Sequence, residues 1–188
     1  MTTNILIGGV GGQGLVLMTN IICQGAMKAG YDVKSNDVVG LSQRGGKVWG
    51  NVRFGEKIYS PNISAKQGDV LIATEPLEAL RWSASLKDGG VIIVNPKTMY
   101  STPVQQEKAE YPKEEIDALK DKYKVIEIDA NEEAKKLGKI QVSNVIMIGA
   151  LARELEIPIK IWEETILENV PPKFKEMNIS AFRVGYNG

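Results

Sequence analysis

The sequence contains no histidine and only one cysteine, Cys23. These two absences exclude Ser-His and Cys-His nucleophilic catalysis, zinc sites of the usual ligand sets and cysteine-ligated iron–sulfur clusters within the chain. Electron transfer through a metal centre therefore requires another protein. Cys23 follows Ile21 and Ile22 in an apolar stretch that predicts a helix, and we interpret it as a small buried hydrophobic residue.

The sequence also lacks a dominant sign of charge and any long hydrophobic run. Lysine plus arginine total 23, and aspartate plus glutamate also total 23, so no net field attracts nucleic acid or an anionic membrane surface. No apolar run approaches the roughly 20 residues that span a bilayer, and the first residues carry no basic targeting segment. We therefore expect a cytoplasmic protein with neither nucleic acid nor membrane as a partner.

Alternating apolar segments indicate an α/β fold. They predict strands at 4–10, 31–39, 48–54, 69–74, 91–95 and 124–129, and helices at 15–29, 76–86, 131–137, 145–155 and 159–169. At 188 residues, the chain fits one domain. We expect a single Rossmann-like domain over 1–188, with a mainly parallel sheet flanked by helices and a helical C-terminal portion from about 143.

Three local patterns add detail to this fold. Ser143 or Asn144 is placed to cap the following helix, which is apolar on all sides over 145–151; burial inside the domain is favoured over a subunit interface. Residues 87–90 predict a turn before the strand at 91–95. Glu132 and Lys136 have the i,i+4 spacing of a surface ion pair.

The first glycine-rich loop follows the first predicted strand and precedes the first predicted helix. It contains a G-x-G-x-x-G pattern formed by Gly9, Gly11 and Gly14, in which glycines let the backbone approach an anion at the helix N-terminus. An NAD site also needs an acidic residue near the end of the second strand, and Asp37 has that position, whereas Asp32 lies at its start. A structural alternative is that the glycines only allow close packing of strand and helix.

The second loop joins the strands predicted at 31–39 and 48–54. In it, Arg44 and Lys47 flank the pair Gly45-Gly46, so the loop can offer a guanidinium group to a carboxylate or phosphate. No dinucleotide fingerprint predicts this loop. The alternative is an exposed turn with ordinary surface charges.

These two loops together resemble those of a known family. Gly9-Val10-Gly11-Gly12-Gln13-Gly14 and Ser42-Gln43-Arg44-Gly45-Gly46, with further matches at Val52–Gly55, Ser60-Pro61, Glu75–Arg81 and Val94-Asn95, resemble the gamma domain of 2-oxoacid:ferredoxin oxidoreductases. Gln43 before Arg44 is most similar to the indolepyruvate branch, since the pyruvate and 2-oxoglutarate branches more often have Glu-Ala-Arg-Gly-Gly. The resemblance is dense over 4–95 and looser toward the C-terminus.

The resemblance implies a subunit that holds no redox centre. In this family thiamine diphosphate, Mg²⁺ and 4Fe–4S clusters are bound by a larger companion, which oxidatively decarboxylates a 2-oxoacid, transfers the acyl group to coenzyme A and reduces ferredoxin in anaerobic metabolism. It further implies that this chain has neither catalytic nor metal-binding residues of its own. The implied binding residues are Gly9, Gly11, Gly12, Gln13, Gly14, Gln43, Arg44, Gly45 and Gly46.

Within that set, the resemblance implies different roles for the two loops. Residues 43–46 would face the companion near the active site, with Arg44 meeting an anionic group of the substrate or of coenzyme A. The loop from Gly11 to Gly14 would receive phosphate. Two alternatives remain open: a free-standing nicotinamide- or flavin-dependent oxidoreductase that uses the Gly9–Gly14 loop, and a purely structural or assembly subunit.

Overall fold

A computed structural model describes residues 2–39, 47–98 and 110–188. Its six-stranded sheet contains β1 (Thr2–Val10), β2 (Asp32–Val39), β3 (Lys47–Gly55), β4 (Gly68–Ala73), β5 (Leu86–Val94) and β6 (Lys124–Glu127). The described helices are α1 (Leu15–Lys28), α2 (Pro76–Ser83), α4 (Lys113–Asp117), α5 (Ala130–Lys136), α6 (Ser143–Arg153), α7 (Ile159–Asn169) and α8 (Lys175–Asn187). Short 3-10 helices are η1 (Ala118–Asp121), η2 (Ile140–Val142) and η3 (Pro172–Phe174).

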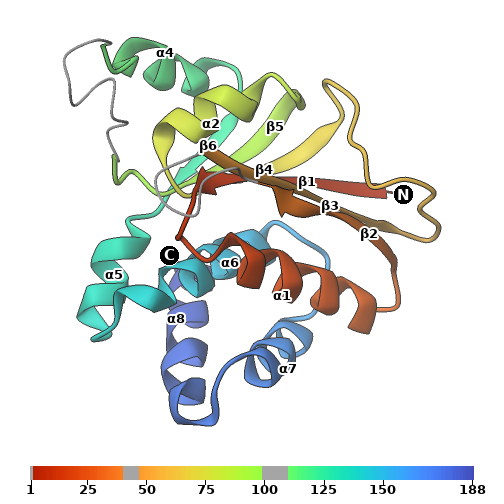
Figure 1. The fold of residues 1–188 in the computed structure, drawn as a ribbon, viewed down its shortest axis with the longest axis vertical. Coiled ribbons are helices and arrows are strands. Elements are labelled where there is room, and N and C mark those ends of the chain that lie inside the picture. The colour runs from red at the N-terminus through yellow and green to blue at the C-terminus, as the bar shows by residue number, and fades with distance from the viewer. Residues whose placement is uncertain (1, 40–46, 99–109) are drawn as a thin grey trace.

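The sheet has the strand order β2-β3-β1-β4-β5-β6. β1, β4, β5 and β6 are parallel to one another, whereas β3 is antiparallel to both of its neighbours, β1 and β2. Helices cover both faces: α1, α6, α7 and α8 lie on one side, and α2 and α4 on the other (Figure 1). The predicted α/β class with a mainly parallel sheet is confirmed.

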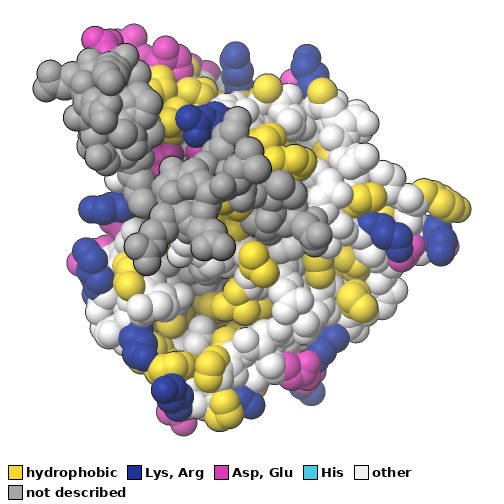
Figure 2. Space-filling model, viewed as in Figure 1, with side chains coloured by type: hydrophobic (Ala, Val, Ile, Leu, Met, Phe, Trp, Pro, Cys, Tyr) yellow, Lys and Arg dark blue, Asp and Glu magenta, His cyan; other side chains and the backbone are white. Residues whose placement is uncertain are grey.

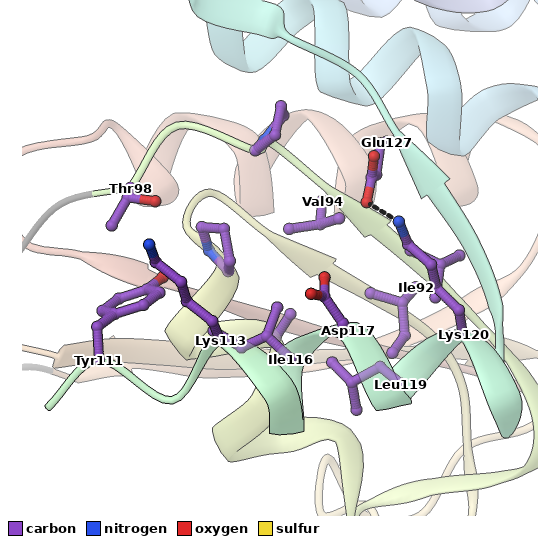
Figure 3. Close-up of a pocket in the computed structure, with 14 residues that line it drawn as sticks. Ile92, Val94, Thr98, Tyr111, Lys113, Ile116, Asp117, Leu119, Lys120 and Glu127 are labelled. Atoms are coloured by element: carbon purple, nitrogen blue, oxygen red, sulfur yellow. Dashed lines mark ion pairs between the residues drawn. The ribbon is translucent and has the colours of Figure 1, made fainter.

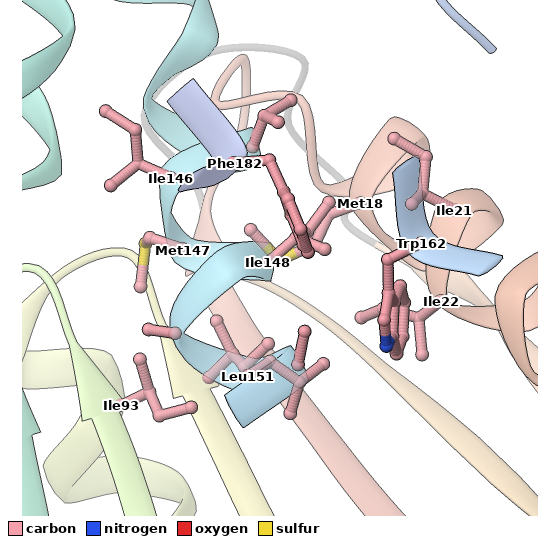
Figure 4. Packing of buried hydrophobic residues seen from close by; sticks show 14 of the residues in the cluster. Met18, Ile21, Ile22, Ile93, Ile146, Met147, Ile148, Leu151, Trp162 and Phe182 are labelled. Carbon is pink, nitrogen blue, oxygen red and sulfur yellow. The ribbon is translucent and has the colours of Figure 1, made fainter. Parts of the chain in front are cut away.

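The larger core lies between the sheet and α6. Every residue of α6 from Asn144 to Ala152 is buried, because the sheet covers one side of the helix and α1, α5 and α8 cover the others (Figure 4). α6 and α8 cross closely at Gly149 and Gly185: a Cβ atom on either glycine would overlap backbone of the other helix. The predicted burial of 145–151 inside the domain is therefore confirmed.

Several local predictions are wrong. The turn predicted at 87–90 is part of β5, because Leu86 already pairs with Gly68 of β4. The strand is irregular here, and Gly89 has φ of 70°. Glu132 pairs with Lys135 and Glu133 with Lys136, so the i,i+3 neighbours form ion pairs in place of Glu132 and Lys136. The helices α4 and α8 were not predicted, and Cys23 is only partly buried.

Candidate functional site

The glycine loop after β1 is shaped by two left-handed residues. Gly12 has φ of 93°, and Gly14, the N-cap of α1, has φ of 72°. Residues with a Cβ atom rarely adopt either conformation, so these positions require glycine. Gly9, still within β1, is required for another reason: its Cβ would overlap Oγ1 of Thr74.

Gln13 holds this loop together with its own side chain. Its Oε1 accepts a hydrogen bond of 2.8 Å from the Val10 amide and a second from the Thr74 hydroxyl, while the Gln13 amide donates to the Val10 carbonyl across 3.2 Å. Val10 ends β1, and Thr74 directly follows β4. Because α1 and α2 leave these neighbouring strands toward opposite faces, Gln13 bridges the topological switch point of the sheet, where α/β folds bind ligands.

Asn144 fixes the loop from the opposite side. Its Nδ2 donates a 2.6 Å hydrogen bond to the carbonyl oxygen of Gln13, and a Cβ on Gly14 would overlap the same nitrogen. The structure therefore corrects the predicted capping role, since α6 has no side-chain cap and Asn144 points at the loop. The amino end of α6 is thereby placed beside the amino end of α1.

These contacts form one wall of a cavity of about 500 Å³, within the size range of small-molecule sites. Its lining residues in the described part of the chain are uncharged: Gly12, Gln13, Gly14, Leu17, Thr74, Asn95, Asn131, Ile140, Gln141, Ser143, Asn144 and Met147. The amide groups of Gly12 and Gly14 donate to no acceptor within the described ranges. Together with the amino ends of α1 and α6, they can bind an anionic or amide-bearing ligand.

Part of this site could not be identified from the glycine pattern alone. Thr74 and Asn95 each follow a buried strand directly, and both are only 3% exposed. The carboxyl ends of parallel strands meet at one edge of the sheet. A polar residue immediately after an apolar strand is therefore a sequence feature that could have identified Thr74 and Asn95. Asn144 had no comparable sign, since its contact with Gln13 depends on tertiary packing.

The second loop leaves the sheet at the same edge. Lys47, which begins β3, is paired with Val10, and Val39, which ends β2, is paired with Trp49 of β3. Its expected binding residues, Gln43, Arg44, Gly45 and Gly46, lie outside the described residues. The fold therefore brings the attachment points of the two loops to one edge, and the roles of 43–46 stay predictions.

Comparison with known proteins decides the family. The sequence profile described as "Pyruvate ferredoxin/flavodoxin oxidoreductase" matches residues 4–188. The chain belongs to this family. It is 37% identical to "Indolepyruvate oxidoreductase subunit IorB" of Pyrococcus horikoshii, with 97% of this chain and 93% of that protein covered.

Solved structures of the oxidoreductase family share the fold. The gamma subunit of a keto/oxoacid ferredoxin oxidoreductase from Geobacter sulfurreducens has a TM-score of 0.73 and 25% identity, over 98% of this chain and 96% of that one. A 2-oxoglutarate:ferredoxin oxidoreductase of Magnetococcus marinus, with 2-oxoglutarate, coenzyme A and succinyl-CoA bound, has a TM-score of 0.76 and 19% identity, over 99% of this chain and 30% of that one. The predicted family is thus confirmed.

The sheet order of this family member also bears on the dinucleotide alternative. In a Rossmann dinucleotide site, the strand that carries the ribose-binding acid lies next to β1. Here β3 separates β2 from β1. The backbone at Asp37 therefore lies two strand spacings, about 10 Å, from β1. In addition, the Val10 amide already donates a hydrogen bond to Oε1 of Gln13. Both features disfavour nicotinamide binding in the usual geometry.

Two buried carboxylates of the family-like segment Glu75–Arg81 have structural partners. Glu75 caps α2 by accepting from the amides of Leu77 and Glu78, at 2.7 and 3.2 Å, and accepts a 2.7 Å bond from the Tyr111 hydroxyl. Burial, followed by the bond to Glu75, raises the pKa of Tyr111. Burial also raises the pKa of Glu78, although Arg81 and Trp82 oppose this shift. These groups position α2.

The side chains of the described residues provide no site for the metal groups that the resemblance assigns to the partner. Within the described ranges no group of three or more His, Cys, Asp or Glu side chains is arranged to bind a metal, and one cysteine cannot supply the four thiolates of a cluster. None of the helices in the described ranges is long and apolar enough to cross a membrane.

Proposed function

We propose that this chain is the small subunit, without a redox centre, of an oxidoreductase that couples oxidative decarboxylation of a 2-oxoacid to coenzyme A and ferredoxin. Indolepyruvate, or another aryl or branched 2-oxoacid, is the proposed substrate. The observation that carries the proposal is the uncharged cavity at the switch point, in a chain matched almost end to end by an indolepyruvate oxidoreductase subunit.

The proposed division of labour follows from the residues available. The 4Fe–4S clusters belong to a larger partner, because one cysteine cannot supply the thiolates of a cluster. The family resemblance assigns thiamine diphosphate and Mg²⁺ to the same partner. When bound there, thiamine supplies the carbanion that attacks the keto carbon and accepts its electrons. This chain positions and encloses the co-substrate. Ferredoxin meets the complex through the partner.

Coenzyme A is the proposed occupant of the glycine-loop edge. The cavity offers backbone amides at Gly12 and Gly14 and side-chain amides at Asn95 and Asn144, a donor set suited to phosphate and to the amides of the pantetheine arm. Arg44, by the family resemblance, adds a cationic group for a carboxylate or phosphate. The Magnetococcus marinus enzyme, in which 30% of the chain shares this fold, was solved with coenzyme A bound.

The surface around the cavity supports a covering partner. Val16, in the first turn of α1, is 69% exposed, and Ile140, which lines the cavity, is 43% exposed. Figure 2 shows hydrophobic side chains in the middle of the face viewed, with charged side chains toward its periphery. Exposed apolar side chains beside a polar cavity are the composition expected of a surface that another subunit buries.

The test is steady-state kinetics of the chain reconstituted anaerobically with its larger subunit. Viologen or ferredoxin reduction should require coenzyme A, indolepyruvate should be preferred over pyruvate and 2-oxoglutarate, and omission of this chain should abolish turnover. Arg44→Ala should raise the KM for coenzyme A or for the oxoacid at least tenfold, a loss on the scale of one charge-assisted hydrogen bond. Arg183→Ala, which removes a surface pair with Glu163, is the matched control. Unchanged kinetics for Arg44→Ala would remove the role proposed for that residue.

A further inference from the structure

A second cavity, of about 230 Å³, lies on the opposite face of the sheet from the glycine-loop cavity (Figure 3). It is bounded by α2, by the carboxyl-terminal halves of β5 and β6, and by α4 with η1. The cavity exists because α4 is only five residues long and buries none of them. A helix this short leaves the apolar surface of β5 and β6 incompletely covered.

The floor of this second cavity is hydrophobic. Ile92, Val94 and Leu119 form it, and all three are at most 7% exposed; Ile116 and Ala79 extend it toward α4 and α2. A ligand body that lies here must therefore be apolar. The volume is that of one small organic molecule, below the usual size of cofactor sites.

The rim carries charges of both signs. Lys113 and Asp117 lie one turn apart on α4, and both side chains line the cavity (Figure 3). Neither forms an ion pair with a residue of the described ranges, whereas Lys120 at the far end is held by Glu127 at 2.8 Å. Lys120 also interacts electrostatically with Asp117. Besides the Lys120–Glu127 pair, the cavity thus presents one cation and one anion, about one helical turn apart, above an apolar floor.

We propose that this cavity binds an amino acid with an apolar side chain. The carboxylate meets Lys113, the ammonium meets Asp117, and the side chain lies on Ile92, Val94 and Leu119. The corresponding 2-oxoacid has the same carboxylate and side chain but no ammonium, so it offers no cation to the Asp117 carboxylate and brings a second negative charge near it. The site therefore selects the amino acid over the oxoacid.

The two cavities meet at the end of β5. Val94 lines the second cavity, and its neighbour Asn95 lines the first. After β4, Pro76 lines the second cavity and Thr74 lines the first. A ligand on one face thus contacts the residues next to those that line the other cavity. Occupancy of the second cavity can shift Asn95 and Thr74 by a short path, so this site adds a point of control to the proposed function without depending on it.

The test is methyl-detected NMR titration of the full chain with L-phenylalanine and, separately, with phenylpyruvate, at pH 7.5. Saturable shifts are expected at Ile92, Val94, Ile116 and Leu119, with L-phenylalanine binding more tightly. Asp117→Asn should weaken the binding of L-phenylalanine about three- to fivefold, as expected for the loss of a partly exposed ion pair. It should not weaken the binding of phenylpyruvate. Lys113→Gln should weaken both ligands.

Glu114→Gln is the matched control, because Glu114 is an exposed acid on the same helix and does not line the cavity. It should leave both affinities unchanged. Absence of saturable shifts at these methyl groups would overturn the proposal. So would equal loss of L-phenylalanine binding in Glu114→Gln and Asp117→Asn, or shifts centred on Leu17 and Met147, which would assign the ligand to the first cavity.

Discussion

The side-chain amide of Asn144 donates to the main-chain oxygen of Gln13 across 2.6 Å, joining residues 131 positions apart. The side chain of Gln13 in turn accepts from Val10 and Thr74. A continuous set of hydrogen bonds therefore runs from α6 through the glycine loop to the end of β4. The shape of the proposed coenzyme site depends on the C-terminal helices as much as on the glycines.

Loss of the hydrogen bond from Asn144 to Gln13 should affect the binding of coenzyme A more than the stability of the fold. Asn144→Ala should lower the free energy of unfolding by about 1 kcal/mol, the usual value of one hydrogen bond, and raise the KM for coenzyme A in the complex. Asn144→Asp should be more harmful, because it places an oxygen against the Gln13 carbonyl. Gln141→Ala, at an exposed lining position, should change little. Wild-type KM in Asn144→Asp would contradict the positioning role.

Gly14 and Gly138 provide a matched pair for the loop. Both have positive φ, 72° and 92°, but a Cβ on Gly14 would overlap Asn144, whereas nothing lies within 4 Å of one on Gly138. Gly138→Ala should cost about 1–2 kcal/mol of unfolding free energy from the backbone conformation alone. Gly14→Ala should cost roughly 1–3 kcal/mol more. The extra cost should disappear when Asn144 is also replaced by glycine, as measured by a double-mutant cycle in urea; additive costs would argue against the contact.

Hydrophobic periodicity was sufficient for most of the fold. Continuous apolar runs identified β1, β4 and β5, and the apolar circumference of 145–151 identified a helix buried on all sides. The same information could not locate α8, whose apolar face is discontinuous in sequence and whose position depends on Gly185 meeting Gly149. It also could not place antiparallel β3 between β1 and β2, since strand order depends on tertiary packing.

The candidate site was predictable where backbone conformation is local. Gly12 and Gly14 have positive φ, which explains why the sequence has glycine at both positions. The partners of Gln13 were not predictable, because Thr74 and Asn144 reach it only after β4 and α6 pack beside the loop. The pattern alone also suggested a nicotinamide site with Asp37, an interpretation that the interposed strand β3 disfavours.

The α6–α8 crossing should tolerate no added methyl group. Gly149→Ala places a Cβ against the carbonyl of Phe182, so it should lower the free energy of unfolding by about 3 kcal/mol or more. Ser180→Ala, on the exposed side of α8, should lie within about 0.5 kcal/mol of wild type. Urea denaturation of both variants gives the comparison; near-equal midpoints would contradict the close crossing.

The burial of Glu78 predicts a dependence of stability on pH. Its pKa is raised above 4.5, mainly by burial, so the folded state holds this proton more tightly than the unfolded state. The neutral form is fully favourable below about pH 4.5, and this contribution is lost as pH rises through the raised folded pKa. The unfolding free energy of wild type minus that of Glu78→Gln should therefore fall across this interval. Parallel curves for the two proteins would contradict the raised pKa.

The most direct test of the central claim is anaerobic affinity purification of the tagged chain from its native host, followed by mass spectrometry and an indolepyruvate-dependent viologen reduction assay. The account predicts recovery of a larger subunit that carries thiamine diphosphate and iron–sulfur clusters, with activity that requires coenzyme A. Recovery of the chain alone, carrying a bound nicotinamide or flavin dinucleotide, would contradict it.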